Sequence, residues 1–255
     1  MQYSANGLAT VIKNKARSKS TLMVAGTLTD PHIKMCDMVG EAVAEKHNAW
    51  QGSAVVNNIQ VFGGTCGNLS ALSSGQGLGA PGSILGTMSG TGNNCASKFP
   101  NADFPAQTDA MTSYMQGVGA GFEQIFNSFM GIAIVSNIEV SGGMCTTTLV
   151  LGAPIPGTYA GGDGVLSKLE GNISGIFNAG LLKTAMLGGM NSAVLVNGIP
   201  TDATNDSIDA FCEAFQEYHE TWMAGTQITG LLVNGGLTIV NAPIVGAIGL
   251  GGKFQ

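Results

Sequence analysis

A motif that recurs three times with constant internal spacing constrains the fold of this chain more than any single residue. The pair Thr-Asp occurs at positions 29–30, 108–109 and 201–202, so the second copy lies 79 residues after the first and the third lies 93 residues after the second. Other residues recur at the same two offsets: Asp30, Asp109 and Asp202; Trp50, Phe129 and Trp222; Gly63-Gly64, Gly142-Gly143 and Gly235-Gly236. A match without gaps from the Thr-Asp pair to the glycine pair predicts three similar structural units.

The segment after each Asp has the periodicity of an amphipathic helix. Apolar residues follow one another at steps of three and four, which places them on one helix face. They include Met35, Val39 and Val43 in the first copy, Met115, Phe122 and Phe126 in the second, and Ile208, Phe211 and Phe215 in the third. A Thr or Asp at the start can accept hydrogen bonds from the free amides of the first turn. We therefore expect a helix of about twenty residues after each Thr-Asp pair, to match the spacing from the Asp to the aromatic residue.

Short β-branched segments precede the glycine pairs and predict strands. They lie at 59–61, 138–140 and 231–233, and a Gly-Gly pair after a strand favours a tight hairpin turn. Second strands are expected at 65–72, 145–151 and 237–240, and further strands at 21–25 and 193–197, leading into two of the Thr-Asp pairs. The predicted fold class is therefore α+β, with three helix-plus-β-hairpin repeats joined by Gly-rich loops. Three linked, similar units suggest a ring with pseudo-threefold symmetry, with a solenoid as the alternative.

These units give the predicted domain organisation. Residues 1–28 form an N-terminal strand or arm, residues 29–107 the first repeat, and residues 201–255 the third. The second repeat, 108–200, includes an inserted short helix at about 165–177. Gly-rich stretches at 73–94, 152–164 and 241–255 are interpreted as the same loop in each unit, and they hold many of the 39 glycines.

The charge balance argues against nucleic acid as a partner. Ten Lys and Arg stand against 16 Asp and Glu, a net charge of −6, whereas nucleic-acid binding depends on cations that neutralise phosphates. Four basic residues nevertheless alternate near the N-terminus: Lys13, Lys15, Arg17 and Lys19. In a strand they would share one face. They would then contact an acidic partner or nucleic acid, or protect a solvated edge strand, and the edge strand is the favoured interpretation.

Cysteine usage and hydropathy favour a protein made in a reducing cytosol. The five cysteines are widely spaced and form no CxxC pair, unlike those of a small disulfide scaffold. The N-terminal segment lacks the apolar core of a signal peptide. The most apolar stretch, 173–196, is interrupted by Asn178, Lys183 and Asn191 together with Gly and Ser, so no membrane span is expected.

The sequence predicts no cofactor, metal or catalytic site. GQGLGA at 75–80 is followed by Pro-Gly, which gives no helix start to bind a phosphate, and no Walker A pattern occurs. His47 and His219 occupy one repeat position that holds Phe126 in the second copy. A metal site shared by three units would therefore lack a ligand, and both histidines are interpreted as residues on amphipathic helix faces. Cys66 and Cys145 are equivalent in the same way, with Thr238 third, and are interpreted as buried strand residues.

One acidic face allows an enzymatic alternative. Glu213, Glu217 and Glu220 share one face of the third predicted helix, and a pair of carboxylates is what glycoside hydrolysis requires. Such faces are more often solvated or salt-bridged to a neighbour. A nucleophilic serine in a GxSxG context is absent from the sequence.

The helix–strand–Gly-Gly units with their LGAPGS, LGAPIPG and NAPIVG loops resemble small structural proteins of bacteriophage tails and baseplates and of related contractile injection machines. The resemblance covers most of the chain, but it carries over no functional residue. Spike-tip proteins of the PAAR kind are a less favoured match, since this chain lacks their zinc-binding His and Cys set. The resemblance implies a non-enzymatic virion protein, assembled in the bacterial host cytoplasm. It would be an adaptor or plug that docks through loops 73–107 and 152–180 onto other tail proteins on a threefold or sixfold axis. A capsid decoration or head-completion protein is the runner-up, and a cell-wall-degrading enzyme is the third possibility.

Overall fold

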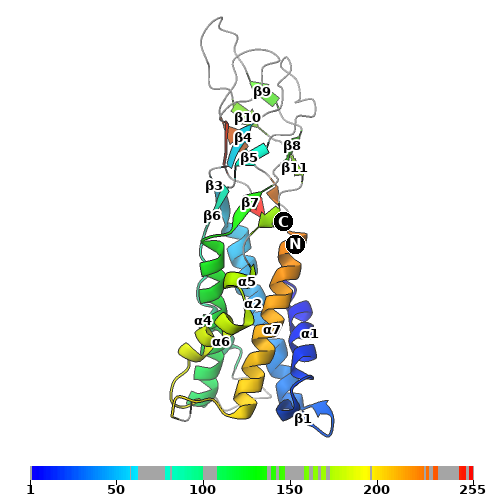
Figure 1. Cartoon of the computed structure of the whole chain (residues 1–255), viewed down its shortest axis with the longest axis vertical. Coiled ribbons are helices and arrows are strands. Elements are labelled where there is room, and N and C mark those ends of the chain that lie inside the picture. The colour runs from blue at the N-terminus through cyan, green and yellow to red at the C-terminus, as the bar shows by residue number, and fades with distance from the viewer. Residues whose placement is uncertain are drawn as a thin grey trace, which may run out of the picture.

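The computed structural model shows an elongated molecule, with helices along one part of its long axis and most of the short strands beyond one end of them (Figure 1). The described residues are 2–57, 59–62, 78–80, 82–99, 108–136, 139–141, 144–146, 158–160, 163–165, 168–170, 173–195, 197–226, 228–229, 232–234, 247–250 and 253–254.

The helical part consists of long and short helices in alternation along the chain. The long helices are α2 (Asp30–Ser53), α4 (Asp109–Met130) and α7 (Asp202–Gly225). The shorter ones are α1 (Ala5–Ala16), α3 (Thr91–Ser97), α5 (Ile173–Ile176) and α6 (Ala179–Gly188), with a 3-10 turn at Ser20–Leu22.

The strands are two to four residues long. They are β1 (Met23–Val24), β2 (Thr27–Leu28), β3 (Val55–Asn57), β4 (Ile59–Phe62), β5 (Leu78–Ala80), β6 (Gly82–Leu85), β7 (Ile134–Ser136), β8 (Glu139–Ser141), β9 (Met144–Thr146), β10 (Thr158–Ala160), β11 (Asp163–Val165), β12 (Lys168–Glu170), β13 (Ile228–Thr229), β14 (Leu232–Asn234), β15 (Ala247–Leu250) and β16 (Lys253–Phe254). The larger sheets have the strand orders β5-β4-β15-β14-β10-β9 and β12-β7-β6-β3.

The three predicted helix starts are confirmed. Each long helix begins at the Asp of its Thr-Asp pair, and the Thr is the N-cap. The hydroxyl oxygens of Thr108 and Thr201 accept hydrogen bonds from amides of the first turn, those of Met111 and Thr204. Thr29 differs, because its hydroxyl is hydrogen-bonded to Nδ1 of His32 at 2.7 Å. The Asp in each first turn also offsets the positive end of the helix dipole.

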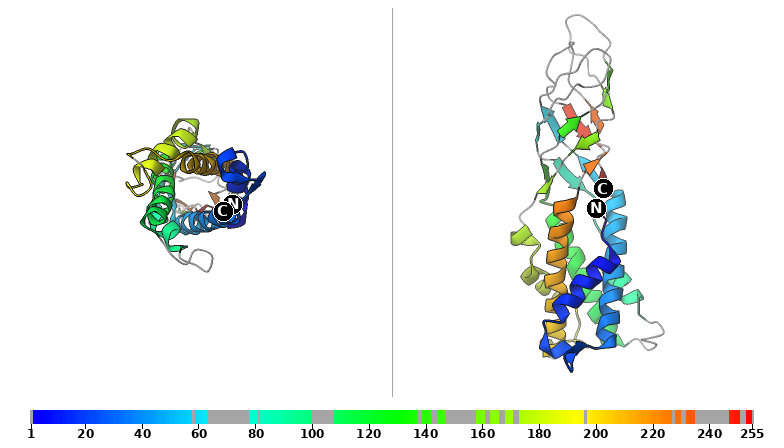
Figure 2. Two further views of the ribbon diagram at one scale, coloured as in Figure 1. Left: turned by 90° about the horizontal axis from the view of Figure 1, so that it is seen from below. Right: turned by 90° about the vertical axis from the view of Figure 1, so that its right-hand side faces the viewer.

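The helices form a closed ring in which short and long ones alternate. The order of contacts around the ring is α1, α2, α3, α4, α6, α7 and back to α1, and the view along the axis shows this arrangement (Figure 2). Each short helix runs antiparallel to its long neighbours. Lys13 near the end of α1 pairs with Asp37 near the start of α2, for example, while Tyr3 bonds Asn48 further along α2. The long helices are therefore parallel to one another.

Small residues let the short helices approach the long ones closely. A Cβ on Gly40 of α2 would lie 2.9 Å from the backbone of Ala5 and Ala9 in α1. A Cβ on Gly119, the repeat-equivalent residue in α4, would lie 2.6 Å from the Thr91 carbonyl oxygen of α3. Gly121 faces the α6 backbone at Met186 in the same way. No side chain fits at these contacts, so the glycines are required by the packing.

The predicted α+β fold class, with three helix-plus-β-hairpin repeats, was wrong, because the described structure is mostly helical. The strands on either side of Gly142-Gly143 do not pair, since β8 pairs with β11 and β9 with β10. The strand before Gly235-Gly236, β14, pairs with β15 and β10. A Gly-Gly pair permits a hairpin but does not impose one, and more distant strands compete for the same backbone groups. All six glycines of the pairs, and the predicted strands 65–72 and 237–240, lie outside the described residues.

The predicted N-terminal strand was also wrong, because residues 5–16 form α1. In a helix, residues two apart point to opposite flanks, about 200° around the axis. Lys13 accordingly pairs with Asp37 of α2, and Lys15 with Glu217 of α7. The alternation of basic residues reflects a helix wedged between two acidic neighbours. The predicted strand at 193–197 is replaced by turns at 192–194. Within the range 165–177, where a short helix was predicted, residues 168–170 form β12 and residues 173–176 form the helix α5.

The close helix contacts give a first prediction. Gly119→Ala should lower the free energy of unfolding by about 1–3 kcal/mol, because its Cβ would overlap the α3 backbone. Gly52→Ala is the matched control, since a Cβ at Gly52 meets nothing within 4 Å. It should leave stability unchanged or raise it by up to about 1 kcal/mol through helix propensity. Chemical denaturation of both variants checks this, and equal effects of the two substitutions would contradict the packing account.

Candidate functional site

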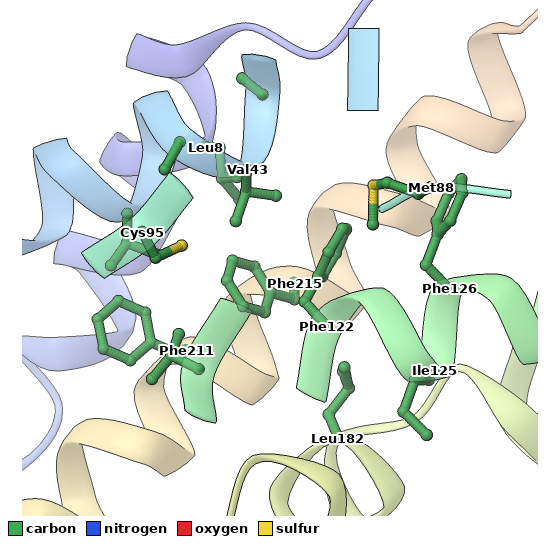
Figure 3. Packing of buried hydrophobic residues seen from close by; sticks show 14 of the residues in the cluster. Leu8, Val43, Met88, Cys95, Phe122, Ile125, Phe126, Leu182, Phe211 and Phe215 are labelled. Atoms are coloured by element: carbon green, nitrogen blue, oxygen red, sulfur yellow. The ribbon is translucent and has the colours of Figure 1, made fainter. Parts of the chain in front are cut away.

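The axis of the ring is filled by side chains from the three long helices, at five levels. The members of each level are related by the offsets of 79 and 93 residues, and all are at most 2% exposed. The levels are Cys36, Met115 and Ile208; Val39, Val118 and Phe211; Val43, Phe122 and Phe215; His47, Phe126 and His219; and Trp50, Phe129 and Trp222. Figure 3 shows Phe122 and Phe215 between the helices, and their ring centroids lie 4.8 Å apart. The side chains of all five levels therefore belong to one buried core.

The level of His47 and His219 differs from the others in chemistry. Both rings are fully buried among aromatic side chains. His47 stacks on Tyr3, with a centroid distance of 3.6 Å, and meets Trp50 and Phe126. His219 stacks on Phe177 at 4.0 Å, and its Nδ1 is hydrogen-bonded to the Tyr3 hydroxyl at 3.0 Å. Both nitrogens of His47, and Nε2 of His219, have no hydrogen-bond partner. Both histidines lie on amphipathic helices, as interpreted from the sequence, and on the faces that are buried in the core.

Burial keeps these groups neutral. It lowers the pKa of His219 to about 3, and it lowers the pKa of His47 well below the usual value, with a further contribution from the positive charge that His219 could carry. Burial also raises the pKa of the Tyr3 hydroxyl well above its usual value, and the nearby Tyr218 adds to this effect. A charge at this level would be surrounded by aromatic rings, which cannot replace its hydration.

Amide side chains of the long helices hold the chain just before two of the short helices. The Tyr3 amide donates to Oδ1 of Asn48 at 2.9 Å, and Nδ2 of Asn48 donates to the Tyr3 carbonyl at 2.9 Å. Asn127, which lies 79 residues after Asn48, makes the same two bonds to Met88, at 2.8 and 2.9 Å. The sequence analysis missed this pair, although the shared repeat position was a signal that could have revealed it.

A second pair of equivalent residues anchors the first residue of a short helix. The Thr91 amide donates to Oε2 of Glu123 at 2.7 Å, and the Ala179 amide donates to Oε1 of Gln216 at 2.9 Å. Glu123 and Gln216 are 93 residues apart and therefore equivalent. These bonds satisfy helix-start amides that have no partner within their own helix.

The acidic face of α7 is occupied by contacts within the chain. Glu213 pairs with Lys19 at 2.7 Å and Glu217 with Lys15 at 2.6 Å. Glu220 accepts a hydrogen bond from Gln216 at 3.0 Å. These residues line a shallow pocket together with Lys15, but the two ion-paired carboxylates serve the attachment of α1. These contacts give the acidic face a structural role.

Among the described residues, the remaining candidates form no chemical site. Residues 78–80 of the GQGLGA stretch form β5, and β6 comes next in the chain, so no helix follows to bind a phosphate. Cys66 lies outside the described residues, and so does the side chain of Cys145. Cys36, Cys95 and Cys212 are buried free thiols, and burial raises the pKa of Cys36 and Cys95 to about 12. Within the part of the chain that the structure describes, no group of three metal-ligating side chains occurs.

Comparison with known protein families, with curated proteins and with solved structures found no match. Among the described helices, none is both long enough and apolar enough to cross a membrane.

Tyr3 gives a second prediction. Tyr3→Phe keeps the stacking on His47 but removes the hydroxyl, so Nδ1 of His219 loses its partner inside the core. We expect the free energy of unfolding at pH 7.5 to fall by about 1–2 kcal/mol. Tyr3→Ala should cost about 3–5 kcal/mol, because it also leaves a cavity. Denaturant titration measures both, and an unchanged stability of Tyr3→Ala would show that the N-terminal segment does not pack here.

Proposed function

We propose that this chain is a structural protein of a virion, an adaptor or plug in a phage tail or baseplate. The observation that carries the proposal is the ring of three helix pairs around a filled axis. One chain thereby presents three similar faces about a line, which suits contact with a partner of threefold or sixfold symmetry on that line. The packed core suits a plug, and the satisfied acidic face of α7 weakens the enzymatic alternative.

The end of the rod where the long helices begin carries two exposed apolar side chains. Two tight turns lie there, Ala25-Gly26 and Asn197-Gly198, and they occupy equivalent repeat positions. All four residues have positive φ, between 49° and 80°, which fits two-residue hairpin turns. Exposed apolar side chains flank them, with Val24 at 63% and Ile199 at 67% exposure. We call Val24 and Ile199 the end pair, and assign it to contact with a neighbouring virion protein.

The experiment is fractionation of particles from the source organism, followed by mass spectrometry and cryo-electron microscopy. The expected result is co-sedimentation with tails and density on the tail axis. Association with heads would favour the capsid decoration or head-completion role. A stable monomer without particle association would contradict both. Turnover of peptidoglycan that Glu213→Ala or Glu217→Ala abolishes would establish the enzymatic alternative.

The end pair gives a third prediction. Val24→Thr combined with Ile199→Thr keeps both side chains β-branched but replaces apolar surface with hydroxyl groups, so particle association should fall at least about tenfold, corresponding to about 1.4 kcal/mol. Ile132→Thr is the matched control, because Ile132 is also exposed, at 49%, but follows the opposite end of α4. Binding of labelled variants to particles that lack the protein measures the effect. Equal losses in both variants would contradict the assignment of the contact to this end.

A further inference from the structure

Two of the three equivalent positions at one level of the axis carry histidine where the third carries phenylalanine. Phe126 is fully buried and makes ring contacts with both His47 and His219. An apolar ring therefore fits this level. The histidines instead bring in nitrogens without partners, which costs stability in a dry core. A residue that lowers stability, at a position where an apolar residue would fit, points to a role other than packing.

Both histidines contact the N-terminal segment, which lies outside the three repeats. Tyr3 stacks on His47 and is hydrogen-bonded to His219, so one side chain contacts both rings. Helix α1 follows directly and closes the ring between α2 and α7. Its ion pairs, Lys13–Asp37 and Lys15–Glu217, are made by partly exposed side chains, and such pairs contribute little individually. The attachment of α1 therefore depends largely on Tyr3 and on the buried residues that follow it.

We propose that Tyr3 and α1 form an acid-released latch, in which protonation of His47 and His219 expels Tyr3 and frees α1 from α2 and α7. The inference concerns the helical part alone and does not depend on the proposed role in a virion. Release would expose the groove between α2 and α7, including the apolar faces that Leu8 and Ile12 now cover.

Aromatic rings dominate the surroundings of the two histidines, and burial disfavours a proton on His47 more than the hydrogen-bonding Asn48 side chain favours one. Phe126 and Phe129 face them from α4, Phe177 from the segment before α6, and Trp50 and Trp222 from α2 and α7. The titratable groups that face them are Tyr3, Tyr218 through Tyr3, each other, and the chain's amino group, whose charge disfavours a proton on His47. Among the described residues no carboxylate contacts either ring.

The direction of the pH dependence of α1 release, and its pH range, follow from the environment of the two histidines. The folded-state pKa of each histidine is below the ordinary value of about 6.5, so the released state binds protons more readily. The latch is therefore fully closed above about pH 6.5 and weakens as the pH falls below it. At pH 4.5 a histidine that titrates near pH 6.5 when released favours release roughly 100-fold.

Hydrogen exchange with mass spectrometry tests the latch, with protection corrected for the intrinsic pH dependence of exchange. Between pH 7.5 and pH 4.5 we expect protection of residues 5–16 to fall at least about 100-fold, while protection of α4 residues 115–126 changes far less. The double variant His47→Phe, His219→Phe should keep α1 protected at both pH values. Each single variant should abolish part of the pH response, so the test does not rest on the double variant alone.

A second comparison separates the histidines from the surface ion pairs. Glu213→Gln with Glu217→Gln replaces two carboxylates that pair with the N-terminal segment, and it should still release α1 at acid pH. Unchanged α1 protection in the wild-type protein would overturn the proposal. So would an equal acid response in the histidine double variant, or loss of α4 protection in step with α1, which would indicate global unfolding.

Discussion

Three side chains meet at each level of the axis, and the rest of the bundle depends on the width of these levels. Rings such as Phe122, Phe126 and Phe215 hold the long helices too far apart to bury their flanks against one another. The spaces left between α2, α4 and α7 accept the short helices, which supply most of the contacts between helices. Gly40 and Gly119 then allow the backbones to approach within van der Waals distance. Large residues on the axis and small residues on the flanks are thus two parts of one packing solution.

The sequence predicted the long helices well because their signals are local. The Thr caps, the acidic first turn and the steps of three and four all lie within each segment, and they agree with one another. The short helices lack such signals. Helix α3 reads TGNNCAS, and α1 contains Gly7, Asn14 and alternating lysines. Segments of this composition and length are marginal helices alone, so their helical state is set by the grooves that receive them. The same non-local selection decides which strands pair, and for that reason the glycine pairs misled the prediction.

Only part of the candidate site could be predicted from the sequence. The repeat alignment placed His47 and His219 opposite Phe126, yet helix periodicity alone could not tell a buried position from a half-exposed one. Two residues outside the repeat-equivalent positions cover the rings: Tyr3 stacks on His47, and Phe177 stacks on His219. The Asn48 clamp that holds Tyr3 was equally recognisable only as a position shared with Asn127. Equivalent positions in an internal repeat therefore carry information that residue type alone does not.

The parallel long helices also give the rod a direction. Their positive dipole ends lie together at one end, where Asp30, Asp109 and Asp202 stand in the first turns. Parallel dipoles repel, and the antiparallel short helices offset this only in part, since they have 12, 7 and 10 residues against 24, 22 and 24 in the long ones. One end thus has helix starts, carboxylates and tight turns, and the other continues into strands. Two chemically different ends and three similar faces fit the proposed role of an adaptor, which joins two different neighbours on one axis.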